Sequence, residues 1–407
     1  MREVAVIGAG MTRFGKLADK GIKDLVAEAV RAAVDDAGVT FGDIEAAYVG
    51  SAVPGVMTGQ EQIKAQVCLS AMGIDSIPMY NVENACASSS SALNLAWTAV
   101  GAGVHDCVLV VGFEKLFDQN KLKSFMALGT AVDIQMVEKF LADFQKRQQS
   151  GERILSEDSG KSKSIFMDMY AYYTRQYMQR YGLTQAHFGK LAVKSHKNGA
   201  HNPHAMYQKE VTLEEVLNSG EVAFPLTRMM CSPVSDGGAA VIVCSREKAL
   251  QYTSTPVWIA SSVVGSGKIS DDLSDTLTRR LGPKAFEMAG IGPRDLDVIE
   301  VHDATSPSEI ITLIELGVCP GEEAPRWIDE GRLEVDGAMP SNPSGGLAAK
   351  GHPIGATGLA QVNEIVHQLQ GKAGKRQVKD AKVGMTHNGG GILGVDAAAM
   401  ALHVFKR

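Results

Sequence analysis

Ala37-Gly38-Val39 and Asp43-Ile44-Glu45 decide the fold class, because both triplets return in altered form 252 residues later. Their counterparts are Ala289-Gly290-Ile291 and Asp295-Leu296-Asp297. In both copies an apolar, strand-like segment follows the acidic turn. A repeat at this distance indicates a duplicated structural unit rather than an array of repeats of about 20 to 50 residues.

The first copy shows which elements the unit contains. We expect a strand at Val4–Ile7, an amphipathic helix at Ile22–Ala37 that Gly38 stops, and a strand at Ala46–Val49. Strands that alternate with helices predict an α/β fold with a mainly parallel sheet and helices on both faces. Two such halves, residues 1–253 and 254–407, are expected to pack together.

Residues 115–230 interrupt the pattern of the first half, because this stretch is more polar and rich in Lys, Gln, Met and Tyr. We expect an inserted region of helices and loops between two strands. Aromatic and methionine side chains gather in one part of it, and at helical spacing such residues are more often core than ligand pocket. They are Met167, Met169, Tyr170, Tyr172, Tyr173, Tyr177, Met178 and Tyr181.

Composition and charge exclude several classes of function. The net charge is −6, so the basic surface that binds nucleic acid is not expected. No apolar run reaches the length of a membrane helix, and the N-terminus does not resemble a signal peptide. The six cysteines are widely spaced without a CxxC pair, which argues against a zinc site. We therefore expect a cytoplasmic protein with reduced thiols.

Cys86 is the exception among the cysteines. It lies in Asn84-Ala85-Cys86-Ala87-Ser88, where small residues precede an apolar helical pattern. This placement predicts a cysteine at a helix N-terminus, where the helix dipole and free N–H groups lower a thiol pKa. The alternative is a buried structural thiol.

A second candidate is His352, which lies in Lys350-Gly351-His352-Pro353, shortly after Asn342-Pro343-Ser344-Gly345-Gly346. The glycines permit a close approach to a ligand or a neighbouring loop. A histidine held in such a turn suits a general base for a thiol. A core or loop-capping histidine is an equally simple interpretation.

Two more polar clusters are expected at strand ends of the second half, where ligand sites of α/β sheets lie. One contains His302-Asp303, and the other is His387-Asn388-Gly389-Gly390-Gly391. Consecutive glycines expose backbone N–H groups that can hold an oxyanion. The alternative for each is an ordinary polar loop. By contrast, Gly8-Ala9-Gly10 lacks the third glycine of a dinucleotide fingerprint, because Arg13 takes its place.

Taken together and in this order, the four clusters resemble the thiolase family over essentially the whole chain. The His302-Asp303 pair is similar to the sterol-carrier-protein-type and archaeal branch. The resemblance implies a duplicated, five-layered αβαβα fold, usually dimeric. It also implies that the insertion is a loop domain that covers the active site and helps to bind coenzyme A.

The resemblance implies a role for each candidate residue. Cys86 would accept the acyl group, His352 would activate Cys86, and His302 would help His352 to bind the thioester oxygen. Backbone N–H groups near Cys86 and Gly390 would form a second oxyanion hole, with Gly389 and Asn388 beside it. Coenzyme A would be a co-substrate, and no metal or permanently bound cofactor is implied. The reaction would be cleavage of a 3-oxoacyl-CoA or the reverse Claisen condensation.

One feature departs from the family pattern. The second reactive cysteine of common thiolases is replaced by His387, and the cysteine that can follow His302-Asp303 is replaced by Ala304. We hypothesise that His387 or His302 exchanges the C2 proton instead. Relatives with this pattern act on branched, sterol-side-chain or aromatic acyl-CoAs, a benzoylsuccinyl-CoA-type thiolase among them. Some of them work with a small partner that carries a zinc ribbon and an OB fold.

Other functions remain open at this level. A retro-aldolase on an acyl-CoA would not need Cys86. A condensing synthase is a further enzyme class, and a non-catalytic subunit would fit the missing second cysteine.

Overall fold

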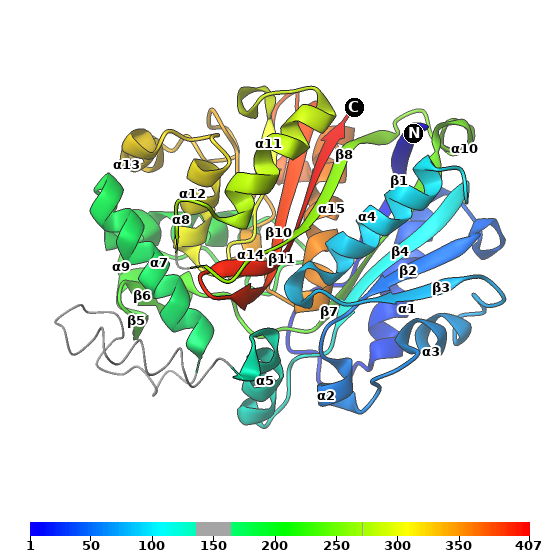
Figure 1. Ribbon diagram of the computed structural model, residues 1–407, viewed down its shortest axis with the longest axis horizontal. Coiled ribbons are helices and arrows are strands. Elements are labelled where there is room, and N and C mark those ends of the chain that lie inside the picture. The colour runs from blue at the N-terminus through cyan, green and yellow to red at the C-terminus, as the bar shows by residue number, and fades with distance from the viewer. Residues whose placement is uncertain (136–163, 271) are drawn as a thin grey trace.

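The structure is a computed structural model that describes residues 1–135, 164–270 and 272–407. Nine strands form one sheet in the order β3-β2-β4-β7-β1-β8-β11-β10-β9 (Figure 1). The strands of the first half are β1 Val4–Met11, β2 Ala46–Gly50, β3 Met79–Val82, β4 Cys107–Glu114 and β7 Gly237–Ser245. Those of the second half are β8 Val257–Ser266, β9 Val298–Glu300, β10 Val383–Leu393 and β11 Asp396–Lys406.

The sheet order confirms the duplication. Counted outward from the junction of the halves, the first half runs β1-β7-β4-β2-β3 and the second runs β8-β11-β10-β9. Corresponding strands of the two halves therefore take the same places. A parallel bridge between Ile299 and Ser341 occupies the place that corresponds to β3. The halves join where β1 pairs with β8, at Ala5↔Trp258 and Val6↔Val257.

The prediction of a mainly parallel sheet is wrong. β2 pairs in parallel with β3 and β4, and β10 with β9, but the remaining neighbours are antiparallel. Parallel neighbours need a crossover connection, whereas antiparallel neighbours do not. β10 and β11 are joined by a short turn at Gly394, and the long insertion joins β4 to β7. Neither connection is the single crossover helix that the alternation rule assumes.

The strands of the first half and those of the second half form two β layers, and three layers of helices complete a five-layered arrangement. The outer face of the first half carries α1 Ile22–Ala37, with α3 Lys64–Ser70 and α10 Arg246–Tyr252 near it. The outer face of the second half carries α11 Leu277–Ala289 and α12 Ser306–Glu315. Between the halves lie α4 Ser88–Gly101 and α15 Thr357–Gln370. α15 packs against strands of both halves and is buried along almost its whole length, which identifies the central layer.

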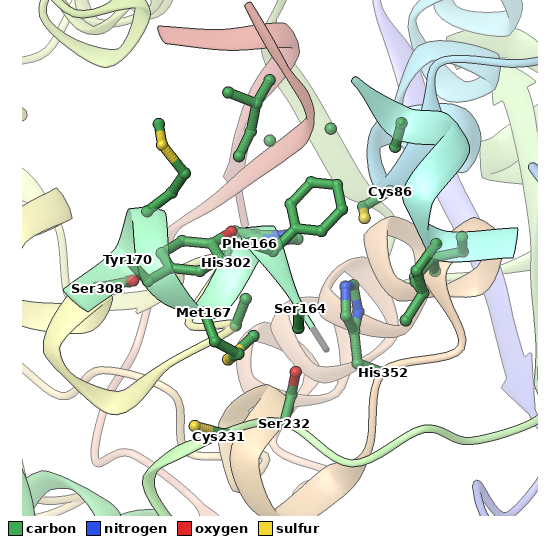
Figure 2. A pocket seen from close by; sticks show the side chains of 18 of the residues that line it. Cys86, Ser164, Phe166, Met167, Tyr170, Cys231, Ser232, His302, Ser308 and His352 are labelled. Carbon is green, nitrogen blue, oxygen red and sulfur yellow. The ribbon is translucent and has the colours of Figure 1, made fainter. Parts of the chain in front are cut away.

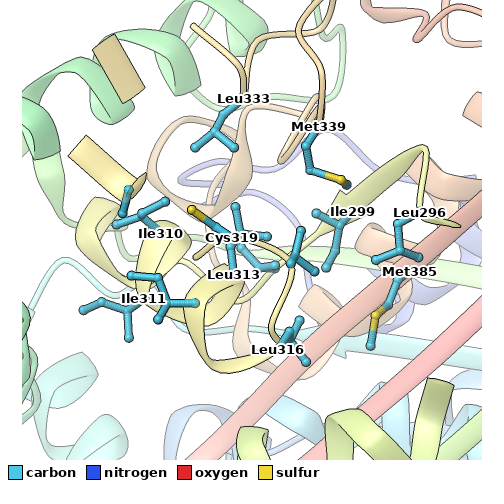
Figure 3. Packing of buried hydrophobic residues seen from close by; sticks show 14 of the residues in the cluster. Leu296, Ile299, Ile310, Ile311, Leu313, Leu316, Cys319, Leu333, Met339 and Met385 are labelled. Carbon is cyan, nitrogen blue, oxygen red and sulfur yellow. The ribbon is translucent and has the colours of Figure 1, made fainter. Parts of the chain in front are cut away.

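The outer layer of the second half has a continuous apolar core (Figure 3). Ile310 and Leu313 of α12 meet Ile299 of β9 and Met385 of β10 in this cluster. Each fully buried side chain of this kind stabilises the fold by about 1.5 to 3 kcal/mol. This packing fixes α12, whose opposite face borders the cavity described below.

The described part of the insertion between β4 and β7 is mostly helical. Its described elements are α5 Lys121–Leu128, α7 Ile165–Tyr181, α8 Gln185–Ala200, α9 Leu213–Leu217, β5 Glu221–Ala223 and β6 Leu226–Thr227. The short helices elsewhere are α2 Pro54–Thr58, α13 Ala324–Asp329 and α14 Gly346–Lys350. No helix within the described ranges has the length and apolar character to cross a membrane.

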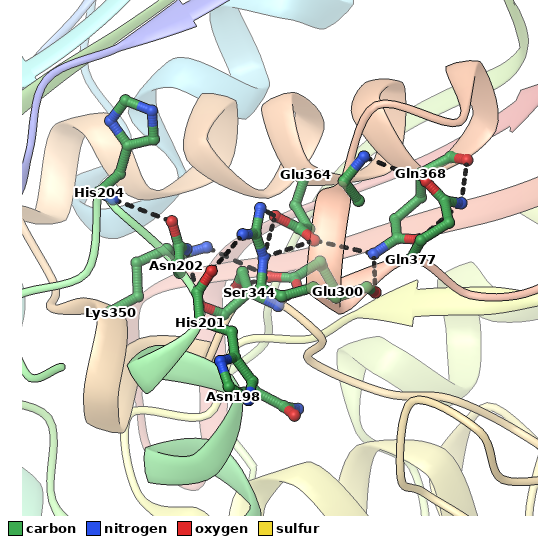
Figure 4. Close-up of polar contacts among 12 residues, drawn as sticks. Asn198, His201, Asn202, His204, Glu300, Ser344, Lys350, Glu364, Gln368 and Gln377 are labelled. Carbon is green, nitrogen blue, oxygen red and sulfur yellow. Dashed lines mark hydrogen bonds and ion pairs between the residues drawn. The ribbon is translucent and has the colours of Figure 1, made fainter. Parts of the chain in front are cut away.

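Buried polar contacts fasten the insertion to the second half (Figure 4). The side-chain amides of Asn198 and Asn202 donate to the backbone carbonyls of Asn342 and Ser344, at 3.2 and 2.8 Å. Ser344 Oγ in turn donates to Glu300, which also forms a buried ion pair with Lys350 at 3.2 Å. The Asn342–Gly346 loop is therefore clamped between the insertion and β9.

Candidate active site

A cavity of about 600 Å³ lies where the two halves and the insertion meet. Cys86, His302, His352 and His387 all line it, as do Gly389 and Gly390. Asn388 lies behind the wall. Figure 2 shows Cys86 and His352 at one side of the cavity and Tyr170 and Ser308 at the other. The fold thus brings together predicted residues that are up to 304 positions apart in the chain.

The backbone presents Cys86 at the start of the central layer. Ala85 has a φ of 48°, in the left-handed region, and turns the chain sharply before Cys86. The short helix η2 Ala85–Ala87 then leads directly into α4. One ligand atom each of Cys86, His302 and His352 lie within 4.8 Å of one another. Strained backbone of this kind is concentrated at functional sites.

The predicted lowering of the Cys86 pKa is wrong for the unliganded protein. Burial, and then the negative charge of Glu114, raise the pKa of this thiol to about 12. Its neighbours are apolar side chains that include Val53, Leu116 and Ile354. Desolvation of a thiolate there outweighs the favourable position at a helix start. Cys86 therefore rests as a thiol and needs a base to react.

His352 is held in one tautomer. Its Nδ1 lies 2.7 Å from Thr357 Oγ1, and that hydroxyl donates to the carbonyl of Pro353 at 3.1 Å. Because the hydroxyl proton is used there, the Thr357 oxygen accepts from His352 Nδ1–H, and the lone pair is on Nε2. Burial first, and then the nearby His302, lower the pKa of His352 well below its usual value. His352 is thus a neutral base.

Glu114, which sequence reasoning missed, supports the loop of His352. This last residue of β4 accepts backbone N–H groups of Val53 and Gly355, at 3.2 and 3.0 Å. Burial raises its pKa to about 7. The contact ties the loop to the first half of the chain.

His302 is held in the opposite tautomer. The Asn388 amide nitrogen lies 3.0 Å from His302 Nδ1, and Ser90 Oγ donates to Asn388 Oδ1 at 3.0 Å. An amide nitrogen only donates, so Nδ1 accepts and the ring proton is on Nε2. Burial lowers the pKa of His302 to about 4. The rings of His302 and His352 stand edge to face, with centroids 5.0 Å apart.

The Asn342–Gly346 motif supports His302 rather than lining the cavity. Asn342 Oδ1 accepts the backbone N–H of Val301 at 2.8 Å. A Cβ on Gly346 would lie 2.2 Å from the Asp303 carboxylate, so only glycine fits there. Asp303 accepts the N–H of Leu347 at 2.7 Å. The glycines serve a close approach to a neighbouring loop, which was one of the two expected uses.

Two glycines of the last cluster lie against the nucleophile. A Cβ on Gly390 would lie 2.2 Å from the Asn84 carbonyl oxygen and 3.0 Å from Cys86 N. Gly391 has a φ of 65°, and the backbone N–H groups of Gly391 and Cys86 lower the pKa of the Cys86 thiol, against the larger opposite effect of burial. Gly391 was not among the expected oxyanion donors. Its place as the third of three glycines was the signal available in the sequence.

His387 is hydrogen-bonded to a helix of its own half of the chain. Its Nε2 lies 3.0 Å from Thr278 Oγ1 at the start of α11. Burial first, and then His302, lower its pKa to about 3. His387 is therefore neutral at physiological pH.

The insertion supplies much of the cavity wall. Met167, Met169, Tyr170 and Tyr173 of α7 line the cavity, whereas Tyr177 packs in the core of the second half. The expectation that these side chains are core was therefore wrong for Met167, Tyr170 and Tyr173, whereas Met169 lines the cavity and is also buried in a small apolar cluster. Helical spacing marks one buried face, and a face against a cavity has the same spacing as one against a core.

Charged side chains on the cavity wall differ between the halves of the chain. Lys16, Lys121 and Arg228 come from the first half, together with Asp118, and Glu315 and Asp396 come from the second. Basic side chains such as these can bind phosphate groups.

Cys86, His302 and His352 are also close enough together to coordinate a metal ion. A cysteine and two histidines are a common ligand set for zinc. Metal coordination would occupy the sulfur lone pair that acyl transfer needs.

Acidification should destabilise the protein through its buried histidines. His403 allows this effect to be tested at a residue outside the active site. His403 lies outside the cavity, and its Nδ1 is 2.9 Å from Ser262 Oγ. Burial lowers its pKa from 6.5 to about 4. Between these pH values the unfolded chain binds the proton and the folded chain does not. The free energy of unfolding therefore decreases by about 1.4 kcal/mol for each unit by which the pH is lowered.

We therefore expect His403→Gln to lose less stability than the wild type between pH 6.5 and 4.5. Urea unfolding at several pH values measures this difference. Parallel pH profiles for the two proteins would contradict the assignment.

Comparison with known proteins gives a consistent result. Residues 4–247 match the family model described as thiolase, N-terminal domain, and residues 265–403 match the thiolase C-terminal domain-like model. The chain is 40% identical to the acetyl-CoA acetyltransferase of Methanothermobacter thermautotrophicus, over the full length of both. It is 36% identical to sterol carrier protein 2 of Gallus gallus, over 95% of this chain and 69% of that protein.

Solved structures show the same fold. One described as Ltp2-ChsH2(DUF35) aldolase superposes with a TM-score of 0.77 at 24% identity, covering 99% of this chain and 97% of the other. Human mitochondrial 3-ketoacyl-CoA thiolase superposes with a TM-score of 0.70 at 17% identity, covering 100% and 98%.

Proposed function

Because this chain belongs to the thiolase family, we propose that it cleaves or forms the C2–C3 bond of a 3-oxoacyl-CoA through an acyl group on Cys86. The supporting observation is that atoms of Cys86, His302 and His352 lie within 4.8 Å of one another in one cavity. A nucleophile beside a neutral base is the arrangement that acyl transfer requires.

In the cleavage direction, His352 Nε2 takes the Cys86 proton as the sulfur attacks the C3 carbonyl. The N–H groups of Cys86 and Gly391 hold the oxyanion that forms at C3. The C2–C3 bond then breaks, and its electron pair becomes an enolate of the departing acyl-CoA. His302 Nε2–H donates to the enolate oxygen, which is the thioester oxygen of that product. The enolate carbon takes up a proton, and a coenzyme A thiol releases the acyl group from Cys86.

Asn388 acts in this proposal through His302 and not on the substrate. Asn388→Asp places a carboxylate beside His302 Nδ1, which draws the ring proton there and removes the donor at Nε2. Loss of one oxyanion donor lowers kcat about 10²- to 10³-fold. We expect a loss of this size, measured as steady-state kcat.

The control is Asn388→Gln, which keeps an amide donor and so does not draw the ring proton to Nδ1, and it should lose less kcat than Asn388→Asp. Wild-type kcat in Asn388→Asp would contradict the role given to His302.

The acyl group is proposed to be branched or aromatic. The apolar wall formed by Met167, Tyr170, Ile311 and Met400 favours a bulky group over a short chain. The proton on C2 is proposed to pass through His387, because both positions of a second cysteine hold other residues. His387→Ala should then abolish turnover, and the alternative is that His302 takes this role.

The assembly is proposed to be a homodimer, with residues 1–253 and 254–407 as its two halves and 115–230 as its loop domain. A small zinc-ribbon and OB-fold partner is also proposed, since one solved structure of similar fold is described as an Ltp2-ChsH2(DUF35) aldolase. Affinity purification of the tagged chain from its native host tests this, because recovery of this chain alone would count against a partner.

The function is tested by intact mass spectrometry after mixing the protein with linear, branched and aryl 3-oxoacyl-CoAs in the absence of free coenzyme A. An acyl mass on Cys86 that disappears when coenzyme A is added is the expected result. Cleavage without any adduct would instead favour a retro-aldolase. Neither cleavage nor adduct, with or without the partner, would favour a non-catalytic subunit.

A further inference from the structure

Three side chains of the active site are arranged much as the ligands of a metal ion are. The ligand atoms of Cys86, His302 and His352, one from each residue, all lie within 4.8 Å of one another. Figure 2 shows the Cys86 sulfur and the His352 ring pointing toward one another. Tetrahedral Zn²⁺ holds sulfur and nitrogen ligands about 3.5 Å apart, and three protein ligands suffice where the fourth position stays open. Small side-chain rotations would therefore close this cluster around a zinc ion.

Hydrogen bonds decide which ring nitrogens are left for a ligand. His352 Nδ1 lies 2.7 Å from Thr357 Oγ1, so its Nε2 remains and carries the lone pair. His302 Nδ1 lies 3.0 Å from the Asn388 amide nitrogen, so here too Nε2 remains. The amide nitrogen can only donate, which puts the proton of His302 on Nε2. A protonated nitrogen cannot coordinate a metal, so only Cys86 and His352 are available as ligands.

The orientation of the Asn388 amide is fixed by its neighbours. Ser90 Oγ donates to Asn388 Oδ1 at 3.0 Å, and both side chains are fully buried. A Cβ on Gly358 would lie 2.1 Å from Ser90 Oγ and 2.7 Å from Asn388 Oδ1, so the helix backbone closes this side. Turning the amide over would set its NH₂ group against the Ser90 hydroxyl, which would lose its acceptor. The amide donor is therefore kept on His302.

We propose that the Cys86, His302 and His352 cluster is a latent zinc site whose third ligand is withheld by Asn388. With Asn388 in place, Zn²⁺ has two protein ligands and dissociates easily. A carboxylate at position 388 would accept a proton from His302 Nδ1, and the lone pair would then be on Nε2. Histidine ligands of metals commonly donate their second N–H group to a carboxylate in this way. The side chain at position 388 thus decides whether His302 is a hydrogen-bond donor or a metal ligand.

Metal binding at this cluster would compete with acyl transfer. The Cys86 S–H bond breaks, the proton passes to the solvent, and a sulfur lone pair binds Zn²⁺, with no change of oxidation state. Each neutral imidazole binds through its Nε2 lone pair. The sulfur and His352 Nε2 are then both occupied, so the amide of Asn388 protects the nucleophile from divalent cations. This inference goes beyond the proposed function, because it concerns the protein without any acyl-CoA.

Metal affinity is measured on chelator-treated protein in the absence of substrate. Competition with a chromophoric chelator gives the affinity for Zn²⁺. Titration with Co²⁺ reports the ligands, because a cobalt–thiolate bond has a charge-transfer band in the near ultraviolet. The partners of metal ligands change metal affinity about 10- to 100-fold, so we expect Asn388→Asp to bind Zn²⁺ at least about tenfold more tightly than the wild type. The cobalt–thiolate band should appear at correspondingly lower Co²⁺ concentrations.

Further variants locate the bound metal. In the Asn388→Asp background, Cys86→Ser should remove the cobalt–thiolate band, and His302→Ala should return the Zn²⁺ affinity to the wild-type value. Cys231→Ala in the same background removes the other thiol among the described residues of the cavity wall, and the band should remain. Asn388→Gln keeps an amide and should bind Zn²⁺ no more tightly than the wild type. Circular dichroism confirms that each variant is folded.

A second measurement keeps the inference testable if Asn388→Asp does not fold. With Asn388 present, His302→Ala should change the Zn²⁺ affinity less than about threefold, whereas His352→Ala should lower it at least about tenfold, because only His352 offers a lone pair. Equal losses in these two variants would overturn the inference, since all three ligands would then be available in the wild type. Equal affinities of the wild type and folded Asn388→Asp would also overturn it.

Discussion

Cys86→Ala is expected to remove the acyl-enzyme and to lower turnover by at least about 10⁴-fold, as loss of a catalytic nucleophile does in other covalent enzymes. No other group near the two histidines offers a comparable nucleophile, among the residues that the structure describes. The substitution removes one sulfur atom, at the edge of an apolar cluster, from a half-buried residue, so the fold should be retained. Intact mass spectrometry with the acylating 3-oxoacyl-CoA measures the adduct, and steady-state assays measure turnover.

A second cysteine in the same cavity provides the matched control. Cys231 also lines the cavity, and burial raises its pKa to about 12 as well. Cys231 does not belong to the close cluster that Cys86 forms with His302 and His352. Cys231→Ala should therefore still acquire the acyl mass. An adduct that persists in Cys86→Ala and vanishes in Cys231→Ala would reverse the assignment of the nucleophile.

His352→Ala should have the second largest effect, a loss of about 10²- to 10⁴-fold in the rate of Cys86 acylation, which is the usual contribution of a general base. The reason is the high pKa of the thiol: at about 12, Cys86 is almost fully protonated at neutral pH and cannot attack without a base. Pre-steady-state acylation followed by quenched-flow mass spectrometry measures the step directly.

Two further measurements sharpen this prediction. The acylation rate of the wild type should show no inflection near pH 6.5, because His352 is already neutral there. In His352→Ala the rate should instead rise with pH as the thiolate becomes more populated. Thr357→Val, which removes only the hydroxyl that fixes the His352 tautomer, should show a smaller loss. A pH-independent rate in His352→Ala, at the wild-type value, would exclude His352 as the base.

The sequence by itself determined the local elements and the candidate residues. Ile22–Ala37 forms a helix with the predicted bounds, because its apolar spacing and the following glycine encode one buried face and a stop. The duplication could be recognised in the sequence because both copies keep similar residues at the helix end and in the acidic turn. Cys86 was placed at a helix start because small residues precede an apolar helical pattern.

Only the tertiary structure decided the strand directions, the use of the tyrosines and the electrostatics of the site. Strand direction depends on how each connection crosses the sheet, and residue periodicity does not record it. Asn388 meets Ser90 and His302 across 298 and 86 positions, so no local pattern could assign its role. The pKa of Cys86 also depends on residues that are distant in the sequence. Its position at a helix start is local and was visible, but desolvation comes from all the residues that surround the sulfur, and those are assembled only when the two halves close on each other.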